Sequence, residues 1–405
     1  MKVAFVGNMN NMFFAITRYF RDRSITADLF LLNNEAPHFT PAADTYDLAY
    51  RDYTYQLSFG NPYWFLNEIK QIKEQGMSEI KKLKEYDVIF ALGSAPAFLE
   101  YFNIKMDFFI PAGIDLYSFP FYIESANKKH RKHLDLFSQY QQKSIKNTEK
   151  VFSSQDILQI PSLKTAITQL SIEKKIKTFY SIPIIYENIY NKNTIQDNFN
   201  KSYWKHEFEK IRKKSKLVVF HHSRHVWKNN IDPNALKQNN FVIEGFAQIV
   251  QEHSSLNPQL ILFDYGPDVA DSKQLISKLG ITNHVEWMPL MNRKDIMVGL
   301  YFCDIATGEF GHGWSMGGTI IESLIASKPL IHYIDKLAID LRHLYPFLYA
   351  QDAKEIHEKI NYFLNNKQKC DEIADRAYLW IKEYCINGPI ESIIQDVYKL
   401  SGSKA

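Results

Sequence analysis

A glycine-rich turn that leads into a helix is the stretch of this sequence best suited to chemistry. It reads GEFGHGWSMGGTIIESLIASKPLI over Gly308–Ile331, with glycines at positions 308, 311, 313, 317 and 318. Such a turn aims free N–H groups and the positive end of a helix dipole at whatever lies above it. A diphosphate or a sugar hydroxyl suits that position, and Glu322 further along the helix can hold a vicinal diol. This combination is the layout of a nucleotide-sugar site.

The second half of the chain alternates between short apolar runs and helical patterns around this turn. We predict strands at Lys216–Phe220, Gln259–Phe263, His284–Met288, Asp304–Thr307 and Pro329–Tyr333. We predict helices at Trp204–Lys214, Phe241–Val250, Ser272–Leu279 and Asp295–Tyr301, and one that carries Glu322. This alternation predicts a parallel, doubly wound sheet, and such sheets bind ligands at the carboxyl ends of their strands.

The first half begins with the same pattern of strand, tight turn and helix. Its predicted strands are Lys2–Val6, Ala27–Leu32, Asp87–Leu92, Lys105–Pro111 and Val151–Ser154. We therefore expect an α/β protein with two doubly wound, Rossmann-like domains that face each other across a cleft. The expected divisions are 1–185 for the first domain, 186–200 for a polar linker, 201–370 for the second domain, and 371–405 for a terminal helix that crosses back to the first.

Composition narrows the class of protein further. Hydrophobic residues make up 45% of the chain and the net charge is +3, which fits a folded globular protein and argues against a nucleic-acid binder. Three scattered cysteines and no apolar stretch long enough for a signal peptide or a membrane span favour the cytoplasm. Two basic segments, Leu66–Tyr86 and Lys128–His133, are either solvated helix faces or contacts to the inner face of a membrane.

The second half resembles the GT-B glycosyltransferases, in particular the retaining family-4 type (glycosyl transferases group 1). The matching pieces are, in order, Lys216–Phe220 with His222–Trp227, Lys237–Phe246, Gln259–Asp268, and the Gly-rich turn with Glu322–Ile331. They span about residues 216–335, whereas the first half resembles the family in architecture alone. The resemblance implies a nucleotide-sugar donor, no metal and no cofactor.

The resemblance also implies roles for individual residues. Arg224 and Lys237 would hold the donor diphosphate, although Lys228 lies near enough in sequence to take the second role. Glu322 would hold the ribose hydroxyls, and Trp287–Leu290 would flank the base. The implied donor site comprises Ser223, Arg224, Lys237, Gly266, Met288, Leu290, His312, Gly313, Gly317, Gly318, Thr319 and Glu322.

One position departs from the family pattern. The family motif has a second Glu eight positions before Glu322, and that position is Trp314 here. The nearest acidic residue upstream is Glu309, whose pairing with Phe310 is comparable to a polar–Phe pair in some family branches. We take Glu309 as a catalytic candidate together with Arg224 and Lys237. The departure leaves retention or inversion of the anomeric centre open.

The first half offers two loops that follow predicted strands. Gly7 and Asn8 would border the donor phosphates, and they lack the GxGxxG pattern of a nicotinamide site. Asp115 is the best acidic candidate near the acceptor and the fourth catalytic candidate, with an Asx turn as its equally weighted structural role. No nucleophile elbow, P-loop or HExxH motif occurs.

These observations together favour a glycosyltransferase that moves a sugar from a nucleotide donor to a glycan, a lipid-linked sugar or a protein. Such an enzyme would serve cell-surface polysaccharide biosynthesis, with retention and without metal. A sugar-nucleotide 2-epimerase of the same fold and a non-catalytic glycan-binding or scaffold protein are the alternatives. The sequence leaves open the donor sugar, the base, the acceptor and the oligomeric state.

Overall fold

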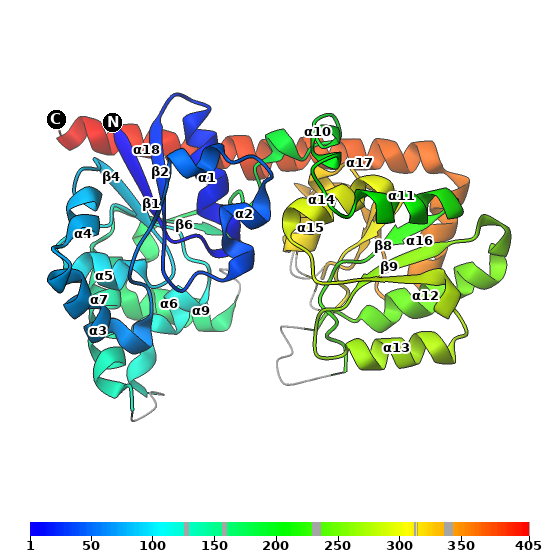
Figure 1. Cartoon of the computed structure of the whole chain (residues 1–405), viewed down its shortest axis with the longest axis horizontal. Coiled ribbons are helices and arrows are strands. Elements are labelled where there is room, and N and C mark those ends of the chain that lie inside the picture. The colour runs from blue at the N-terminus through cyan, green and yellow to red at the C-terminus, as the bar shows by residue number, and fades with distance from the viewer. Residues whose placement is uncertain are drawn as a thin grey trace. The chain divides into compact units, whose positions relative to one another are not determined.

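The computed structural model describes residues 1–124, 129–155, 160–228, 236–311, 313, 315–335 and 343–404. The chain divides into two compact units, and each is described below by itself (Figure 1). Unit 1 comprises Met1–Tyr186 together with Tyr384–Ala405, and unit 2 comprises Glu187–Glu383. In the described part of the chain, no helix combines the length and the apolar character that a membrane crossing requires.

Unit 1 is built on a parallel sheet with the strand order β3-β2-β1-β4-β5-β6-β7. The strands are β1 Lys2–Val6, β2 Thr26–Leu31, β3 Thr54–Gln56, β4 Val88–Ala91, β5 Phe108–Phe109, β6 Lys150–Ser154 and β7 Ile176–Phe179. The chain winds outward from β1 in one direction and then from β4 in the other. The switch point of this sheet, where ligands bind in such folds, therefore lies between β1 and β4.

The helices of unit 1 cover this sheet, and aromatic rings fill much of its core. The helices are α1 Met12–Arg21, α2 Pro41–Asp44, α3 Phe65–Glu74, α4 Ser78–Leu83, α5 Ala95–Tyr101, α6 Ile114–Tyr117, α7 Arg131–Asn147, α9 Pro161–Leu170 and α18 Gly388–Lys404. Helix α1 is apolar on almost every side, and each residue from Met12 to Phe20 is buried. The Phe5 ring stacks on Phe90 with 4.7 Å between centroids, so aromatic contacts join β1 and β4.

The last helix belongs to unit 1 although it ends the chain. Ile390, Ile393 and Val397 of α18 are fully buried. The carboxylate of Asp396 forms ion pairs with Lys150 at 2.7 Å and with Lys177 at 3.0 Å, on the neighbouring strands β6 and β7. A six-residue π-helical segment, Lys382–Asn387, precedes α18 and contains the boundary between the units.

Unit 2 contains the second parallel sheet, with the strand order β10-β9-β8-β11-β12-β13. Its strands are β8 Val218–Phe220, β9 Gln259–Phe263, β10 Val285–Met288, β11 Ile305–Thr307, β12 Leu330–His332 and β13 Leu348–Tyr349. Here too the winding reverses, because the chain runs from β8 to β10 on one side and from β11 to β13 on the other. The switch point of unit 2 lies between β8 and β11.

Helices lie on both faces of this second sheet. They are α10 Gln196–Phe199, α11 Lys205–Lys214, α12 Asn239–Glu252, α13 Val269–Lys278, α14 Arg293–Phe302, α15 Gly318–Ile325, α16 Ala353–Asn365 and α17 Lys367–Ile381. Val219 packs with the apolar residues of α12, whereas Phe220 on the opposite face lies against Gly299 of α14. The doubly wound α/β architecture predicted for both halves is confirmed.

The structure corrects several predicted elements. The strands β3, β7 and β13 were not predicted, and β5 is shorter than the predicted Lys105–Pro111. The segment Leu66–Tyr86 is not a single helix, because a turn between α3 and α4 interrupts it. Gly76 and Met77 both adopt positive φ values there, +80° and +59°, which an α-helix does not accommodate.

Candidate functional site

The loops that leave β8 and β11 at the switch point of unit 2 are tied together by a buried polar network. His221 Nδ1 lies 2.8 Å from Thr307 Oγ1, and its Nε2 lies 2.8 Å from Asn239 Nδ2. Asn239 Oδ1 in turn accepts a hydrogen bond from Val226 N at 2.9 Å. Because an amide NH₂ can only donate, Nε2 accepts and Nδ1 carries the proton of a neutral imidazole. The network fixes the loop 221–226 beside the strand that precedes the Gly-rich turn.

Burial reinforces the neutral state of this histidine. His221 is fully buried, and burial together with His225 and His222 lowers its pKa well below the ordinary value. It therefore supplies hydrogen bonds without charge. We infer that His221 positions the loop that carries Ser223 and Arg224.

Lys237 lies between two loops and contacts the predicted acidic candidate. Its amide N donates to Val226 O at 2.7 Å, and its carbonyl accepts from Phe310 N at 3.1 Å. Its Nζ forms an ion pair with Glu309 Oε2 at 2.6 Å, and both side chains are mostly buried. The structure thus brings together two residues that are far apart in the sequence. Helix α12 starts at Asn239, after a residue with φ of +54°, so Lys237 lies on the loop that precedes this helix.

The N-terminus of α15 lies at the end of the Gly-rich turn and is not capped by a side chain. Gly317 is the N-cap residue, and no side chain of a described residue caps the first turn of the helix. A Cβ added to Gly318 would have no heavy atom of a described residue within 4 Å, so the described residues leave the space above its backbone open. The first amides of a helix have no intrahelical acceptor and carry a positive dipole end. This terminus therefore offers donors to an anion.

Two hydroxyl groups near this terminus are buried without a partner in the described part of the chain. They are Thr319 Oγ1 in the first turn of α15 and Ser223 Oγ on the loop after β8. Buried hydroxyls are normally hydrogen-bonded, because leaving one unpaired costs about 1–3 kcal/mol.

Glu322 lies one turn into α15 and has two partners that the sequence analysis did not assign. His222 Nε2 lies 2.9 Å from its Oε2, and Arg293 Nε donates to its Oε1 at 3.0 Å. Burial raises the pKa of Glu322, but the hydrogen bond from His222 and the charge of Arg293 outweigh it and hold the pKa below its ordinary value. The side chain is therefore an oriented carboxylate.

A signal for both missed residues was present in the sequence. His222 follows β8 directly, and Arg293 opens α14 after β10, so both leave the carboxyl edge of the sheet. Both residues contact Glu322, and their spacing in the sequence does not indicate these contacts. His222 Nδ1 is buried and has no partner among the described residues, so it too faces an unmet hydrogen bond.

Arg224 is the unpaired cation of this site. Its side chain is half-buried and forms no hydrogen bond or ion pair with any residue that the structure describes. Lys228, the alternative phosphate ligand, instead pairs with Asp271 of α13 and is 61% exposed. The contacts place Lys237 at the Gly-rich turn and Lys228 away from it.

Some of the other residues predicted to contact the nucleotide-sugar donor are packed in the interior, and others are exposed. Met288 is buried, whereas Leu290 is 64% exposed. Gly266 has a φ of +121°, and a Cβ there would lie 2.4 Å from His225 O, so packing alone explains this glycine. Gly313 has a φ of +72° and lies against Asp335 N, while His312 and Trp314 lie outside the described residues.

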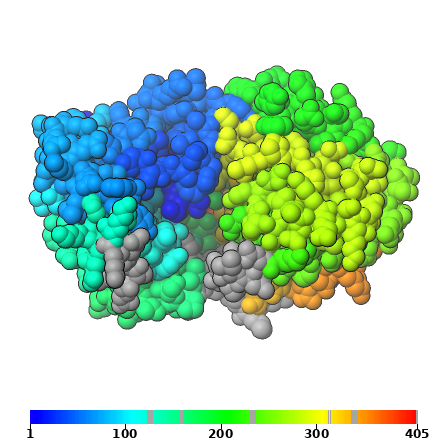
Figure 2. Space-filling model, turned by 60° about the horizontal axis from the view of Figure 1, so that its bottom comes forward, coloured from blue at the N-terminus to red at the C-terminus, as the bar shows by residue number. Residues whose placement is uncertain are grey.

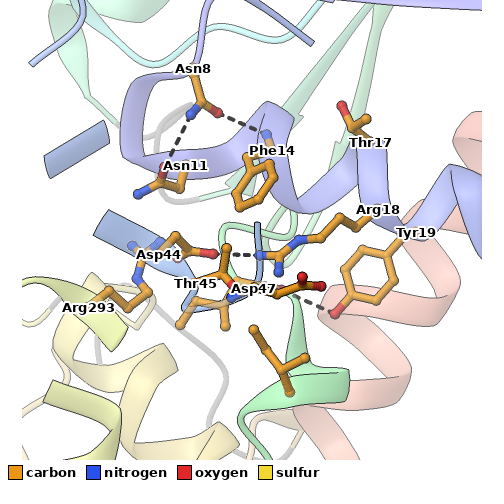
Figure 3. Close-up of polar contacts among 12 residues, drawn as sticks. Asn8, Asn11, Phe14, Thr17, Arg18, Tyr19, Asp44, Thr45, Asp47 and Arg293 are labelled. Carbon is orange, nitrogen blue, oxygen red and sulfur yellow. Dashed lines mark hydrogen bonds and ion pairs between the residues drawn. The ribbon is translucent and has the colours of Figure 1, made fainter. Parts of the chain in front are cut away.

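In unit 1, Asn8 organises its own loop. Asn8 Oδ1 accepts from Phe14 N at 2.8 Å, and its Nδ2 donates to Asn11 Oδ1 at 3.1 Å and to Phe39 O (Figure 3). The residue is fully buried, so its side chain has no exposed surface for a donor phosphate. Gly7 has a φ of +95° and packs against Leu92, across the switch point between β1 and β4. The contacts of Asn8 support a loop-organising role, and its predicted contact to a donor phosphate stays a prediction.

Asp115 has a structural role of the same kind. Its carboxylate accepts hydrogen bonds from the amides of Gly93 at 2.8 Å, Ala112 at 2.9 Å and Gly113 at 2.9 Å. The side chain is fully buried, and burial raises its pKa to about 6 against the effect of those amides. These contacts support the turn-forming role, and the catalytic role of Asp115 stays a prediction.

Glu35 is a second carboxylate in unit 1 with a shifted pKa, and it gives a prediction about stability. Its Oε1 accepts from Asn8 N at 2.6 Å, and burial raises its pKa from 4.5 to about 7. Because the pKa of Glu35 is higher in the folded protein than in the unfolded chain, ionisation of Glu35 lowers the free energy of unfolding at pH values above the unfolded-state pKa. Glu35→Gln keeps an acceptor for Asn8 N, so urea unfolding at pH 8 should show a gain on the order of 1–3 kcal/mol that shrinks towards pH 5.

The control for this prediction is Glu79→Gln. Glu79 also accepts a loop amide, from Ser58 N at 3.0 Å, at the same edge of the sheet. This variant should show no gain at pH 8. An equal gain for Glu35→Gln at both pH values would contradict the prediction.

Two doubly wound units, with ligand-facing loops at their switch points, define the GT-B fold. No family model matches the chain, and no curated protein matches its sequence. Solved structures do match over nearly the whole chain. HepE from Anabaena in complex with UDP has a TM-score of 0.60 and 17% identity, over 98% of this chain and 100% of HepE.

Two further solved structures agree with this result. A glycosyltransferase from Rickettsia africae has a TM-score of 0.59 and 16% identity, over 98% of each chain. The sucrose-phosphate synthase of Thermosynechococcus elongatus has a TM-score of 0.60 and 11% identity, over all of both chains. This chain therefore has the fold of these proteins, and the GT-B fold expected from the sequence is confirmed.

Proposed function

We propose that this protein is a glycosyltransferase that transfers a sugar from a nucleotide-sugar donor to a hydroxyl group. The observation that carries the proposal is the uncapped N-terminus of α15, with Glu322 one turn below it, at the switch point of unit 2. Open amides suit a diphosphate, and an oriented carboxylate suits a ribose diol. The likeness to HepE in complex with UDP-glucose supports a donor of this class.

In this proposal the diphosphate is bound by cations and backbone amides. Arg224 offers a planar guanidinium that is free to pair with phosphate oxygens, and the amides near Gly317 and Gly318 offer further hydrogen bonds. When the anomeric C–O bond breaks, negative charge grows on the leaving diphosphate. Donors that are already in place stabilise that charge without having to reorganise.

Lys237 and Glu309 would act as a pair next to the diphosphate. A Cβ added to Gly317 would lie 3.5 Å from Glu309 Oε1, which is an ordinary van der Waals distance. The Glu309 carboxylate therefore adjoins Gly317. Lys237 would therefore reach both Glu309 and an anion at the helix terminus. The negative charge of Glu309 would suit the positive charge that develops at the anomeric carbon.

The finer features of the reaction are part of the same proposal. We propose transfer without a metal and with retention, to a glycan, lipid-linked or protein acceptor, in the cytoplasm or at the inner face of a membrane. In the described residues, no group of three or more His, Cys, Asp or Glu side chains could hold a metal ion. The cations and amides around α15 are the groups that would neutralise the leaving diphosphate instead.

A thermal-shift screen with UDP, GDP, ADP, CMP and dTDP tests the proposal. A nucleotide at about 100 times its dissociation constant should stabilise the fold by about 2.7 kcal/mol. The nucleotide sugar of the best base is then incubated with the protein, with and without candidate acceptors. Transfer to an acceptor supports the proposal, whereas isomerisation of the sugar without any acceptor would show a 2-epimerase. A chain that binds none of the nucleotides is not a donor-dependent transferase.

The anion-binding role of the helix terminus gives a prediction of its own. Gly318→Ala meets no atom in the fold, and alanine favours a helix by about 1 kcal/mol over glycine. The variant should therefore unfold at the same temperature or slightly higher. Its methyl group would occupy space above the open amides, so calorimetry should show UDP binding weakened by about tenfold or more. Unchanged UDP affinity would contradict the placement of the diphosphate.

A further inference from the structure

A buried tyrosine contacts the Gly-rich turn from the interior of unit 2. Tyr345 lies shortly before β13, and its side chain is only 1% exposed. Its hydroxyl donates to the carbonyl oxygen of Ser315 at 2.6 Å, and Ser315 lies shortly before Gly317, the N-cap residue of α15. This contact joins the turn to a part of the chain that the proposed sugar transfer does not otherwise involve.

The hydrogen bonds around this hydroxyl run in one direction. A carbonyl oxygen can only accept, so the single phenol proton of Tyr345 is used on Ser315. His332 Nε2 lies 3.1 Å from the same hydroxyl oxygen, and it must therefore carry a proton and donate to it. His332 is fully buried, and burial lowers its pKa to about 3, so the imidazole stays neutral.

Aromatic packing fixes the tyrosine ring. It stacks on His332 with 5.8 Å between centroids, and its centroid lies 5.4 Å from the ring of Trp380 in α17. Trp380 Nε1 donates to His343 O at 3.1 Å, so the indole ring is held as well. In Figure 2 the orange part of unit 2, to which α16 and α17 belong, reaches the surface, whereas the Tyr345 ring is buried. The hydroxyl therefore contacts the turn from a well-packed interior.

The Gly-rich turn contains many residues that constrain a backbone weakly. Gly311, Gly313, Gly317 and Gly318 lie within it, and glycine loses more conformational freedom on ordering than any other residue. The proposed diphosphate site needs the first amides of α15 in one arrangement before the donor arrives, because donors already in place require no reorganisation. A hydrogen bond to Ser315 reduces the conformations that are open to the residues that follow it.

We propose that Tyr345 is a positioning residue for the nucleotide-sugar donor. Its hydroxyl holds Ser315 and thereby keeps the first amides of α15 in the arrangement that binds a diphosphate. Tyr345 acts through the backbone of the turn and does not need to touch the donor itself. The inference rests on the proposed function, but the conformation of the turn can be measured without any nucleotide.

Tyr345→Phe tests the proposal, because it removes the hydroxyl and keeps the ring that packs on His332 and Trp380. The probe is the tightest binder among UDP, GDP, ADP, CMP and dTDP, and calorimetry is run well below the melting temperature of the variant. If the turn then has the binding arrangement about a tenth of the time, the apparent dissociation constant rises about tenfold, by the inverse of that fraction. Affinity equal to that of wild type would overturn the proposal.

Steady-state kinetics separate positioning from direct catalysis. A saturating donor selects the binding arrangement of the turn, so KM for the donor should rise about tenfold while kcat stays within about twofold of wild type. A lower kcat with an unchanged KM would indicate a group that acts only in the transition state, and it would overturn the positioning role. A hydroxyl that only fills the core would change neither constant at a temperature where the variant is folded, and that result would overturn the proposal too.

Hydrogen–deuterium exchange measures the turn in the absence of nucleotide. Phe310 N donates to Lys237 O at 3.1 Å on one side of the turn. On the other side, Ile321 N donates to Gly317 O at 3.0 Å. Exchange at these two amides should be at least about threefold faster in Tyr345→Phe, because the released turn opens more often.

The exchange result distinguishes the inference from the proposed function. Unchanged exchange in Tyr345→Phe, with a nucleotide bound by the wild-type protein, would overturn the role of Tyr345 and leave the proposed function intact. A wild-type protein that binds none of the nucleotides would overturn both.

Tyr349→Phe is the matched control for the loss of a hydroxyl. Tyr349 lies on β13, in the same segment of unit 2, and its hydroxyl oxygen lies 3.4 Å from Gln351 Oε1. The affinity of this variant should stay within about twofold of wild type, because an exposed substitution away from the turn has a small effect. Equal losses in Tyr349→Phe and Tyr345→Phe would overturn the assignment to Tyr345.

Two variants of His332 test the same contact if Tyr345→Phe does not fold. Glutamine and methionine have similar shapes, but only glutamine can donate a hydrogen bond to the tyrosine hydroxyl. His332→Gln should bind the nucleotide at least about threefold more tightly than His332→Met, because the donated proton keeps the hydroxyl directed at Ser315. Equal affinities of these two variants would overturn the proposal.

Discussion

Arg224→Ala is expected to reduce sugar transfer by about 10²- to 10³-fold, the loss that follows when one donor to a developing negative charge is removed. Binding of the nucleotide identified by the thermal-shift screen should weaken by about 10- to 100-fold, because a hydrogen bond to a charged group contributes about 1.5–3 kcal/mol. The fold should be unaffected, since Arg224 has no partner among the described residues. Calorimetry with that nucleotide and a transfer assay with its sugar donor measure the two effects.

Two further variants make this result specific. Lys228→Ala removes a nearby cation that already pairs with Asp271, so the affinity for the nucleotide should stay within about twofold of wild type. Arg224→Lys keeps the charge but loses the planar fork, and it should fall between wild type and alanine. Full activity of Arg224→Ala would falsify the assignment of the diphosphate to this loop.

Glu322→Gln is expected to weaken binding of the nucleotide identified by the screen by about 10- to 100-fold, through the loss of a charged acceptor for the ribose diol. Glutamine has the same shape, so the variant removes the charge and leaves most of the packing intact. Alanine would be a poorer test, because it removes the carboxylate that the mostly buried side chains of Arg293 and His222 contact. Removing one member of a buried ion pair costs about 3–5 kcal/mol of folding free energy.

The same variant should also change how stability depends on pH. The pKa of Glu322 is held below its ordinary value of 4.5, so its ionised form stabilises the fold at neutral pH. That contribution is present above pH 4.5 and is lost as the pH falls through the lower folded-state value. In urea unfolding, the stability difference between wild type and Glu322→Gln should therefore narrow at acid pH. A difference independent of pH would contradict this role.

Glu252→Gln is the matched control for the binding measurement. Glu252 ends α12 and also has a histidine partner, His357 Nε2 at 2.7 Å, and its pKa is likewise lowered by that hydrogen bond. Its replacement should leave the affinity for the nucleotide unchanged.

Much of the fold could be predicted from the sequence because buried parallel strands leave a strong signal. Runs such as Lys2–Val6 and Gln259–Phe263 are apolar on both faces, and the structure has strands there with the same bounds. The strands that were missed are short or partly exposed. Thr54–Gln56 and Ile176–Phe179 lie at or near an edge of the first sheet and lack a continuous apolar run.

Some parts of the candidate site could be predicted from the sequence and others could not. The difference depends on how far apart in the sequence the interacting residues lie. The Gly-rich turn and Glu322 are local, so their spacing already describes a helix terminus. The ion pair of Lys237 with Glu309 and the hydrogen bond of His222 to Glu322 join segments far apart in the sequence. Asn8 and Asp115 illustrate a related difficulty. A polar residue after a strand can bind a ligand or stabilise its own loop. Only the hydrogen-bond partners around it show which of these roles it has.

Helix α18 has a consequence for how the protein is made. Because Ile390, Ile393 and Val397 fill the interior of unit 1, the part of unit 1 that is synthesised before unit 2 has an incomplete core until α18 has been made. A ribosome would release most of unit 2 while unit 1 still exposed an unfilled apolar surface. A premature stop codon between the codons of unit 2 and those of α18 would therefore damage unit 1, most of which is encoded before unit 2.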